Sequence, residues 1–337
     1  MSNPPWGTAG ASPRASARYS DVMLYEAARL YYVDDATQAQ IAARLDTSRA
    51  TVSRLLAEAR ARGIVHIEIR PPQFTPDPDL AVQCAQALGL QRVWLGPSAQ
   101  GAPVGLALGP AVQEALIAAD LHPGDALLVS SGATIYEVSQ GEIPRLPGVT
   151  LAPTVGGQDE PEAFYQTNEI TRQMAVKAHG VPLFLYAPAL PSPDLYEVLI
   201  QGPSIQRVLE LWKTAKAALL GVGSAPLGRT SVPSVLPRDK VTLADAVGDI
   251  CARPFDVDGQ PVYFDGSERL LAMQFEDLRR VPVAIAVAAG AAKRVALLAA
   301  ARAGYFNQLV TNPETARLLI EEAEPRSTDG DGLLSGS

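Results

Sequence analysis

The pattern of apolar and polar residues predicts two short amphipathic helices within residues 37–63. Apolar residues recur there three or four positions apart, a spacing that places them on one face of a helix. They are Ile41, Ala42 and Leu45 in the first helix and Val52, Leu55, Leu56 and Ala59 in the second. The two apolar faces can pack against each other, so this stretch predicts a helical pair.

Polar residues at the ends of these helices predict a tight connection between them. Thr37 precedes Gln40 by three positions, which is the spacing of a capping box at the start of a helix. Asp46, Thr47 and Ser48 are small polar residues that can end the first helix and cap the second. The resulting turn of about three to four residues is typical of a helix-turn-helix motif.

The second helix carries the candidate DNA-contacting residues. Its face opposite the apolar stripe is slim and bears arginine, which fits a major groove. An ordinary helical hairpin with solvated arginines has the same spacing, so this alternative stays open on periodicity alone. The residues predicted to contact DNA are Thr37, Gln38, Ser48, Arg49, Ala50, Thr51, Ser53 and Arg54.

The segments on either side extend the motif. Residues 64–69 alternate apolar and polar side chains, which predicts a strand and hence a β-wing beside the second helix. Residues 21–33 place Val22, Tyr25, Leu30 and Val33 at roughly helical spacing, so we expect a third helix that packs on the pair through them. These features predict a winged helix-turn-helix domain over residues 19–70.

The charge distribution favours the DNA-binding interpretation. Residues 37–63 hold five arginines against two carboxylates, in a chain whose net charge is −8. Residues 1–70 carry a net charge of +2, so the remainder carries −10. An acidic remainder repels DNA, and we expect contact with nucleic acid through the N-terminal segment alone.

Length and composition predict how the rest of the chain is divided. The 337 residues, of which 47% are hydrophobic, are enough for roughly two domains with a large buried core. Four prolines within residues 71–78 are incompatible with a helix interior or a central strand, so we place a linker there. We expect a disordered leader over residues 1–18, a second domain over 79–323 and a disordered tail over 324–337.

The remaining compositional features predict a cytoplasmic protein without metal or cofactor. No apolar run has the length of a membrane span, and residues 1–18 lack the apolar core of a signal peptide. The two cysteines, Cys84 and Cys251, do not form a CxxC motif, and the three histidines are scattered. Neither a disulfide nor a metal site is indicated.

Beyond the linker, short apolar runs alternate with longer helical stretches, which predicts an α/β fold with a mostly parallel sheet. Small residues follow these runs, and in such a sheet the loops after the strands surround the ligand. Glycine-rich turns at helix starts favour an anion, for which the phosphate group of a small molecule is the natural candidate. The predicted strands are 126–130, 149–155, 183–187, 217–222, 283–287 and 309–311.

The chain from about residue 19 to residue 322 resembles the SorC family of bacterial transcriptional regulators. The resemblance is carried by an ordered series of motifs rather than by any single one. In the N-terminal part they are Leu30-Tyr31-Tyr32, Gln40-Ile41-Ala42, Ser48-Arg49, Thr51-Val52-Ser53-Arg54-Leu55-Leu56 and Gly63-Ile64-Val65. In the second part they are Asn168, Ala246-Val247-Gly248-Asp249-Ile250, Lys293 and Asn307-Gln308-Leu309-Val310-Thr311.

This resemblance implies a Rossmann-like, sugar-phosphate isomerase-like second domain that senses a phosphorylated sugar. It also implies a homo-oligomer, dimer or tetramer, on operator DNA beside a sugar-catabolism operon. Ser131, Gly132, Ala133 and Thr134 would form the phosphate loop, Gly156 and Gly157 a second loop, and Lys293 would supply the cation. Two positions depart from the family pattern, since Ala289 replaces a glycine before Gly290 and Ser131 replaces an aromatic residue.

Five further polar residues are candidates for effector binding, each with an alternative role. Asp249 and Arg253, in a predicted loop, could bind sugar hydroxyls or phosphate, or lie at the surface or an interface. Asn168 and Arg172 lie one helical turn apart and could face the effector or a neighbouring helix. Asp265 could face the pocket or shape a turn with the glycine that follows it.

Three functions fit these features: a regulator controlled by a phosphorylated sugar, an enzyme that acts on sugar phosphates, and a regulator whose pocket is degenerate. No histidine lies in the glycine-rich loops, and no nucleophile and base are evident. We therefore predict a regulator, with no catalytic residues, whose partners are double-stranded operator DNA, a phosphorylated sugar and further copies of the chain.

Overall fold

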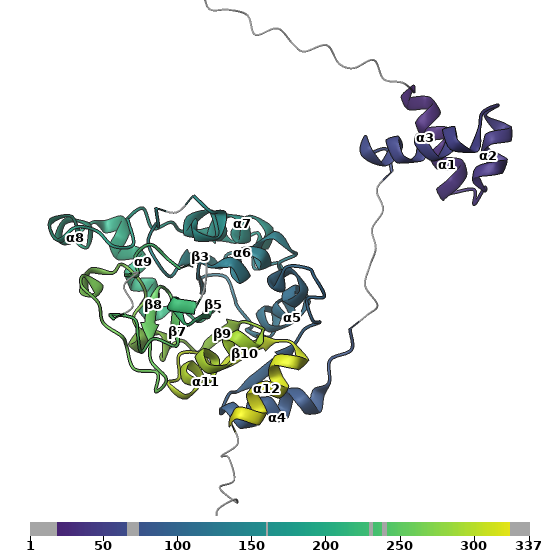
Figure 1. Ribbon diagram of the computed structural model, residues 1–337. Coiled ribbons are helices and arrows are strands. Elements are labelled where there is room, and N and C mark those ends of the chain that lie inside the picture. The colour runs from purple at the N-terminus through teal and green to yellow at the C-terminus, as the bar shows by residue number, and fades with distance from the viewer. Residues whose placement is uncertain (1–18, 66–73, 160, 229–231, 238–240, 324–337) are drawn as a thin grey trace, which may run out of the picture. The chain divides into compact units, whose positions relative to one another are not determined.

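The computed structural model describes residues 19–65, 74–159, 161–228, 232–237 and 241–323 (Figure 1). The chain divides into two compact units, residues 1–73 and 74–337, which we call the head and the body. The predicted leader, the predicted tail and residues 66–69 of the predicted wing lie outside the described residues.

The head is built from three helices around one small core. They are α1 Asp21–Tyr32, α2 Gln38–Arg44 and α3 Arg49–Ala61. The predicted capping box of Thr37 and Gln40 begins α2, and the Ser48 side chain caps α3 by accepting from Thr51 N. All four predicted apolar residues of α3 are buried, together with Ile41 and Ala42 of α2. The predicted helix-turn-helix is therefore confirmed.

The predicted packing of α1 is correct at Leu30 and wrong at Val22, Tyr25 and Val33. Leu24, Ala27, Ala28 and Leu30 face the core, whereas Val22 and Val33 are 74% and 73% exposed. The sequence pattern contained two apolar stripes on this helix. The inward side carries Ala27 and Ala28 between the two leucines, and these small side chains allow α1 and α3 to approach closely.

The body is an α/β unit around a seven-stranded parallel sheet, as predicted. The strand order is β1-β10-β9-β5-β2-β3-β4, and every neighbouring pair is parallel. The strands are β1 Arg92–Leu95, β2 Ala126–Val129, β3 Thr150–Pro153, β4 Val181–Pro182, β5 Ala217–Gly221, β9 Val283–Val287 and β10 Gln308–Thr311. Five of the six predicted strands are present, and β1 was not predicted.

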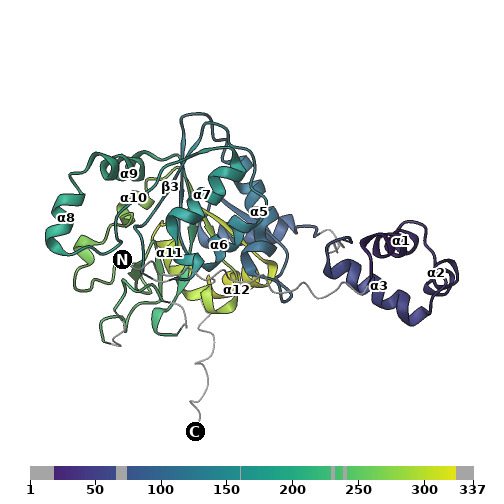
Figure 2. The same cartoon turned by 90° about the horizontal axis from the view of Figure 1, so that it is seen from above.

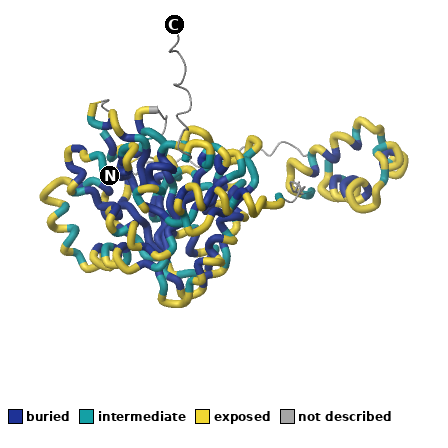
Figure 3. The backbone as a smooth tube through the Cα atoms, turned by 90° about the horizontal axis from the view of Figure 1, so that it is seen from below, coloured by how far each residue is buried: buried dark blue, intermediate teal, exposed yellow. Residues whose placement is uncertain are grey.

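Helices cover both faces of this sheet (Figures 1 and 2). Alternate residues of each central strand enter different cores, as the period of two in a strand requires: Leu127 packs with α5, α6 and α7, and Leu128 packs on the opposite face. Figure 3 shows the buried residues gathered in the interior of the body. The helices are α4 Pro78–Leu88, α5 Val104–Ala118, α6 Ala133–Gln140, α7 Thr167–Ala178, α8 Pro193–Leu199, α9 Pro203–Thr214, α10 Phe275–Leu278, α11 Arg294–Arg302 and α12 Pro313–Ala323.

The predicted strand at residues 183–187 does not form. The chain makes only the short strand β4, and Leu183 N then donates once more to Leu151 O, at 2.8 Å. Two residues later the Asn168 side chain replaces the neighbouring strand: it accepts from Leu185 N at 3.0 Å and donates to Leu185 O at 3.1 Å. A side-chain amide thus ends the sheet at this edge.

A second, antiparallel sheet was not predicted. It consists of β6 Gly223–Ser224, β7 Gly248–Ile250 and β8 Arg253–Phe255, in that order. Asp249 and Arg253 were placed in a loop, but they lie in β7 and β8 and are 7% and 9% exposed. These strands are only two or three residues long, which is too short for the alternation of apolar and polar side chains to predict a strand. Four short 3₁₀ segments, η1 Ala163–Tyr165, η2 Pro226–Gly228, η3 Ser267–Arg269 and η4 Ala291–Lys293, complete the described body.

Candidate functional site

A cavity of about 240 Å³ lies beyond the carboxyl ends of β2 and β5. β2 and β5 are neighbours in the sheet. The strand that follows β2 in the sheet, β3, lies on the side of β2 away from β5, whereas β9, which follows β5 in the sheet, lies on the side of β5 away from β2. The strand order therefore reverses between β2 and β5. Ligands of open α/β sheets bind at such a reversal, because the two connecting loops diverge there and leave a crevice. Residues 131–134 after β2 and residues 221–224 after β5 line the cavity.

The N-terminus of α6 forms one wall of this cavity. Gly132, the residue before the helix, has φ 109° and ψ 156°, a conformation that is essentially restricted to glycine. No side chain caps α6, in contrast to α2, α3 and α4. The first amides of a helix have no acceptor within it, so this end presents donors and a positive partial charge to an anion.

The opposite end of α6 is fixed by Lys177 of α7. Its Nζ donates to the carbonyl oxygens of Ser139, Gln140 and Gly141 at 2.6–2.8 Å. A cation at the C-terminus complements the helix dipole. Partial burial of the Lys177 ammonium lowers its pKa. The helix that faces the cavity is therefore held firmly at its far end.

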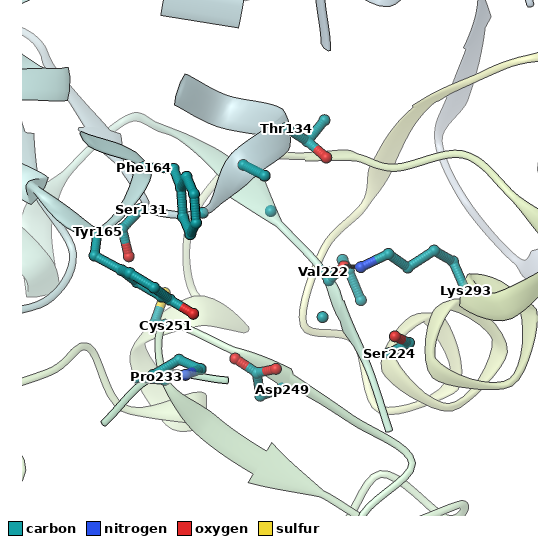
Figure 4. A pocket seen from close by; sticks show the side chains of 15 residues that line it. Ser131, Thr134, Phe164, Tyr165, Val222, Ser224, Pro233, Asp249, Cys251 and Lys293 are labelled. Atoms are coloured by element: carbon teal, nitrogen blue, oxygen red, sulfur yellow. Dashed lines mark hydrogen bonds between the residues drawn. The ribbon is translucent and has the colours of Figure 1, made fainter. Parts of the chain in front are cut away.

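Two groups of opposite charge also line the cavity (Figure 4). Lys293 of η4 directs its Nζ toward the chain after β5 and donates to Val222 O at 2.6 Å. The carboxylate of Asp249 lies in β7 and is buried. Thr134 lies across from it, and the Tyr165 phenol points toward it. The cavity thus has a donor-rich wall at α6 and Lys293, and an acceptor at Asp249.

Ser131 is held by a residue behind the cavity wall. Gln158 is 8% exposed, and its Nε2 donates to Ser131 Oγ at 3.3 Å. Because Ser131 Oγ accepts this hydrogen bond, its O–H is left to donate to an acceptor inside the cavity. Ser131 therefore adds a donor to the cavity wall.

The turn between β7 and β8 brings a strained segment to the cavity. Cys251 and Ala252 both line it, with φ values of 54° and 58°. Two successive residues with positive φ define the tight hairpin turn that normally uses Asn-Gly, because other residues are strained there. Burial raises the pKa of the Cys251 thiol to about 12, so the thiol is protonated and unreactive at neutral pH.

The structure brings together six of the twelve predicted effector-binding residues. Ser131, Gly132, Ala133, Thr134, Asp249 and Lys293 all line the cavity. Gly156 and Gly157 lie beyond β3, where Gly157 N donates to Ala187 O at 2.8 Å. A Cβ at Gly156 would meet Ala187 O at 2.8 Å, so close packing accounts for that glycine.

The other four predicted residues have different partners. Asn168 bridges Leu185, as described above, and Arg172 forms a two-pronged ion pair with Glu169 at 2.7 Å. The Arg172 guanidinium lowers the pKa of Glu169 to about 2. Asp265 is exposed in the turn before Gly266, whose φ is 87°. Arg253 donates to three backbone carbonyls rather than facing the cavity.

Several cavity residues were not predicted from the sequence. Phe164 and Tyr165 come from η1, a short segment with no periodicity to identify it. Cys251 and Ala252 follow a strand too short to predict. Gly223 and Ser224, which the sequence places in the loop after this strand, do line the cavity. Gly221 and Val222, which the sequence places in the strand itself, line it as well.

The head presents the predicted DNA-contacting residues on its surface. Arg49, Ala50, Ser53 and Arg54 of α3 are exposed. Three hydroxyl residues of the predicted set serve as caps or cap partners: Thr37 bonds with Gln40, and Ser48 Oγ lies 2.9 Å from Thr51 Oγ1. Gln38 and Arg49 line an open groove together with Tyr31 and Tyr32.

A helix-turn-helix head and a body with a cavity at the sheet's reversal define the class of DNA-binding protein that carries a ligand-binding domain. Residues 73–321 match the "Putative sugar-binding domain" family, and residues 28–73 match the MarR family. Among the described residues, no helix is both long and apolar enough to cross a membrane.

Known proteins are similar along nearly the whole chain. The sorbitol operon regulator of Klebsiella pneumoniae is 30% identical over 309 residues, which cover 89% of this chain and 98% of that protein. The deoxyribonucleoside regulator of Bacillus subtilis is 31% identical over 306 residues, covering 88% and 96%. The crystal structure of full-length SorC from Klebsiella pneumoniae superposes with a TM-score of 0.65, covering 89% of this chain and all of that one.

The chain belongs to the SorC family of transcriptional regulators. It is a transcriptional regulator with a sugar-binding domain, not an enzyme, as the sequence predicted.

Proposed function

We propose that the protein regulates a carbohydrate-catabolism operon and that a phosphorylated sugar, bound in the body's cavity, controls its binding to operator DNA. The main support is the position of the cavity, at the reversal of strand order and against the uncapped N-terminus of α6. The sorbitol operon regulator and the deoxyribonucleoside regulator are both named for carbohydrate-containing compounds.

The two ends of the cavity suit the two ends of a sugar phosphate. The α6 amides, the hydroxyls of Ser131 and Thr134 and the Lys293 ammonium would receive the phosphate oxygens, since charge-assisted hydrogen bonds are the strongest available. The buried Asp249 carboxylate would accept hydrogen bonds from sugar hydroxyls. A cavity of about 240 Å³ has room for a compact ligand of this kind.

A panel of sugar phosphates tests this assignment by thermal unfolding of the full chain. A ligand present at 100 times its Kd should stabilise the folded state by about 2.7 kcal/mol. The same compound should move the midpoint of an electrophoretic shift with operator DNA. If no compound in a broad panel stabilises the protein, the degenerate-pocket alternative is favoured. Turnover of a compound would instead support the alternative of an enzyme that acts on sugar phosphates.

Replacing Lys293 by alanine should weaken the response to the effector and leave DNA binding without effector intact. Loss of one charge-assisted hydrogen bond costs about 1.5–3 kcal/mol, which lowers effector affinity by about 10- to 150-fold. Titration of effector against a fixed protein–DNA complex measures it. Lys216→Ala is the matched control, because Lys216 precedes β5 at the end away from the cavity and binds Asp120 O and Asp125. Loss of DNA binding itself in Lys293→Ala would identify a structural role instead.

Replacing Arg49 or Arg54 by alanine should weaken operator binding. Both side chains are exposed near the start of α3, the part of a recognition helix that meets base edges. A lost bidentate base contact costs about 1–3 kcal/mol and relaxes sequence preference at one position. Binding to the operator and to single-base variants of it measures both effects. Arg60→Ala, in the last turn of the same helix, should change affinity less and leave the preference unchanged.

A further inference from the structure

The regular pairing of β2 with β5 stops at the base of the cavity. Its last regular bond runs from Ser130 N to Leu219 O, at 3.0 Å. The bonds of a parallel ladder are evenly spaced, so the next two would run from Gly221 N to Ser130 O and from Gly132 N to Gly221 O. Both amides donate elsewhere: Gly132 N to the carbonyl of residue 164 in η1, at 2.8 Å, and Gly221 N to the side chain of Ser130.

The hydroxyl of Ser130 takes the place of the residue's own carbonyl as the acceptor. Ser130 Oγ accepts from Gly221 N at 2.8 Å and donates to Ser131 O at 3.2 Å. The residue is buried, with 2% of its surface exposed. One buried hydroxyl therefore bonds to both of the loops that line the cavity, as acceptor to one and donor to the other.

The loops after β2 and β5 separate just beyond this hydroxyl. Figure 4 shows Ser131 and Thr134 from the first loop, and Val222 and Ser224 from the second, around the cavity. A Cβ at Gly221 would lie 3.3 Å from Ser131 O, so the two chains are still adjacent at the base of the cavity. A small rotation would be enough for the ladder to continue by one step and bring the two loops together.

We infer that Ser130 is a positioning residue of the effector cavity, because its hydroxyl replaces the backbone acceptor at the end of the β2–β5 ladder and thereby keeps the two loops apart. Ser130 acts through Ser131 and Gly221, which line the cavity. A buried residue that fixes the groups around a ligand spares the ligand the cost of ordering them. The ligand side of this role rests on the proposed function, whereas the opening of the crevice does not.

Replacing Ser130 by alanine tests the geometry without any ligand. Gly221 N then loses its acceptor, which is costly unless it finds another, so it should bond to the carbonyl of residue 130. A crystal structure of the full-length variant should show this bond and a narrower cavity. In solution, iodoacetamide should modify Cys251, which lines the cavity, several-fold more slowly than in the unaltered protein. The buried Cys84 of α4 is the internal reference and should react at an unchanged rate.

The panel of sugar phosphates tests the consequence for binding. For the member that stabilises the unaltered protein most, calorimetric titration of Ser130→Ala should give a Kd raised by about tenfold or more, as for the loss of one charge-assisted hydrogen bond. Ser130→Thr keeps the hydroxyl and should retain most of the affinity, even where its extra methyl group lowers stability.

Ser139→Ala is the matched control, because it removes another buried hydroxyl at the far end of α6. Ser139 is fully buried, and its Oγ donates to Tyr136 O at 2.6 Å. Its loss should lower the unfolding temperature without changing the Kd or the rate of Cys251 modification.

Two kinds of result would overturn this role of Ser130. The first is a Ser130→Ala structure in which a water replaces the hydroxyl and the cavity keeps its width, or Cys251 modification that is as fast as in the unaltered protein or faster. The second is an unchanged Kd in Ser130→Ala, or an equal rise in Ser139→Ala. If no sugar phosphate stabilises the unaltered protein, the proposed function fails, and the two ligand-free measurements decide whether Ser130 holds the crevice open.

Discussion

Replacing Gly105 by alanine should destabilise the body and weaken effector binding together. Gly105 lies in the first turn of α5, directly against α6, and a Cβ there would lie 2.1 Å from Thr134 O and 2.9 Å from Val138 N. These are backbone atoms that cannot rotate away, so the two helices would have to separate. We expect a loss of about 3 kcal/mol, the upper end of the usual range for overpacking, or more.

The same substitution should weaken effector binding, because α6 contacts both α5 and the cavity. Gly105 N donates to Glu137 Oε2 of α6 at 2.7 Å, and this bond would be lost as the helices part. Thr134, the residue that a Cβ would strike, lines the cavity. A displaced α6 therefore moves the amides proposed to bind phosphate. The increase in unfolding temperature that the effector produces should be smaller in Gly105→Ala than in a variant that is equally destabilised at a site far from the cavity.

Gly109→Ala is a matched control for this experiment. It lies one turn further along the same helix, and a Cβ there meets no atom within 4 Å. Alanine is favoured over glycine in a helix by about 1 kcal/mol, so this variant should be unchanged or slightly more stable. Urea unfolding of both variants measures the contrast. Equal midpoints would contradict the close packing of α5 on α6.

The sequence predicted the parts of the fold that rest on local patterns. The helix-turn-helix could be found because Thr37, Ser48 and the apolar residues of α3 act within a few positions of one another. The central strands could be found because they are buried on both faces and read as continuous apolar runs. The register of α1 could not, because two apolar stripes competed and only tertiary packing selects between them.

The candidate cavity was predictable where glycine-rich loops follow long strands. Ser131 to Thr134 and Lys293 belong to such loops and line it. The roles of Asn168 and Arg253 were not predictable, because their partners are backbone groups 17 to 20 positions away along the chain. In a sequence, a polar residue that bonds to the backbone cannot be distinguished from one that binds a ligand. The structure distinguishes them, because the first kind is buried and already has its hydrogen-bond partners in the protein.

Replacing Arg253 by methionine should be among the most destabilising single changes in the body. The side chain is 9% exposed, and it donates to Met273 O at 2.9 Å and to Leu270 O and Ala272 O at 3.0 Å. Burial removes the guanidinium from water and thereby lowers its pKa. Methionine fills the space but removes the Arg253 donor from all three carbonyls, and Leu270 O keeps Ala272 N as a donor at 2.9 Å.

The expected loss is about 3–5 kcal/mol, because each buried carbonyl that loses its donor costs about 1–3 kcal/mol. It should appear as a lower urea midpoint with little change in slope, since the exposed area on unfolding is similar. Arg253→Lys should recover only part of the loss, because an ammonium cannot reproduce the planar fork of donors. Unchanged stability in Arg253→Met would mean that the three carbonyls find other partners.

Arg172→Met provides the contrast, because both arginines were predicted to bind the effector. Arg172 is exposed, and its ion pair within the described part of the chain is with Glu169, so its removal should change stability little and leave the effector response intact. Arg253 holds residues 270–273, and this segment is bonded to the chain after β3 because Gly156 N donates to Leu271 O. Since these contacts are structural, Arg253→Met should reduce the effector response only in proportion to the fraction of the body that unfolds. If Arg172→Met instead abolished the response in a fully folded protein, a ligand-binding role for Arg172 would be restored, and the binding site would extend beyond the cavity to α7.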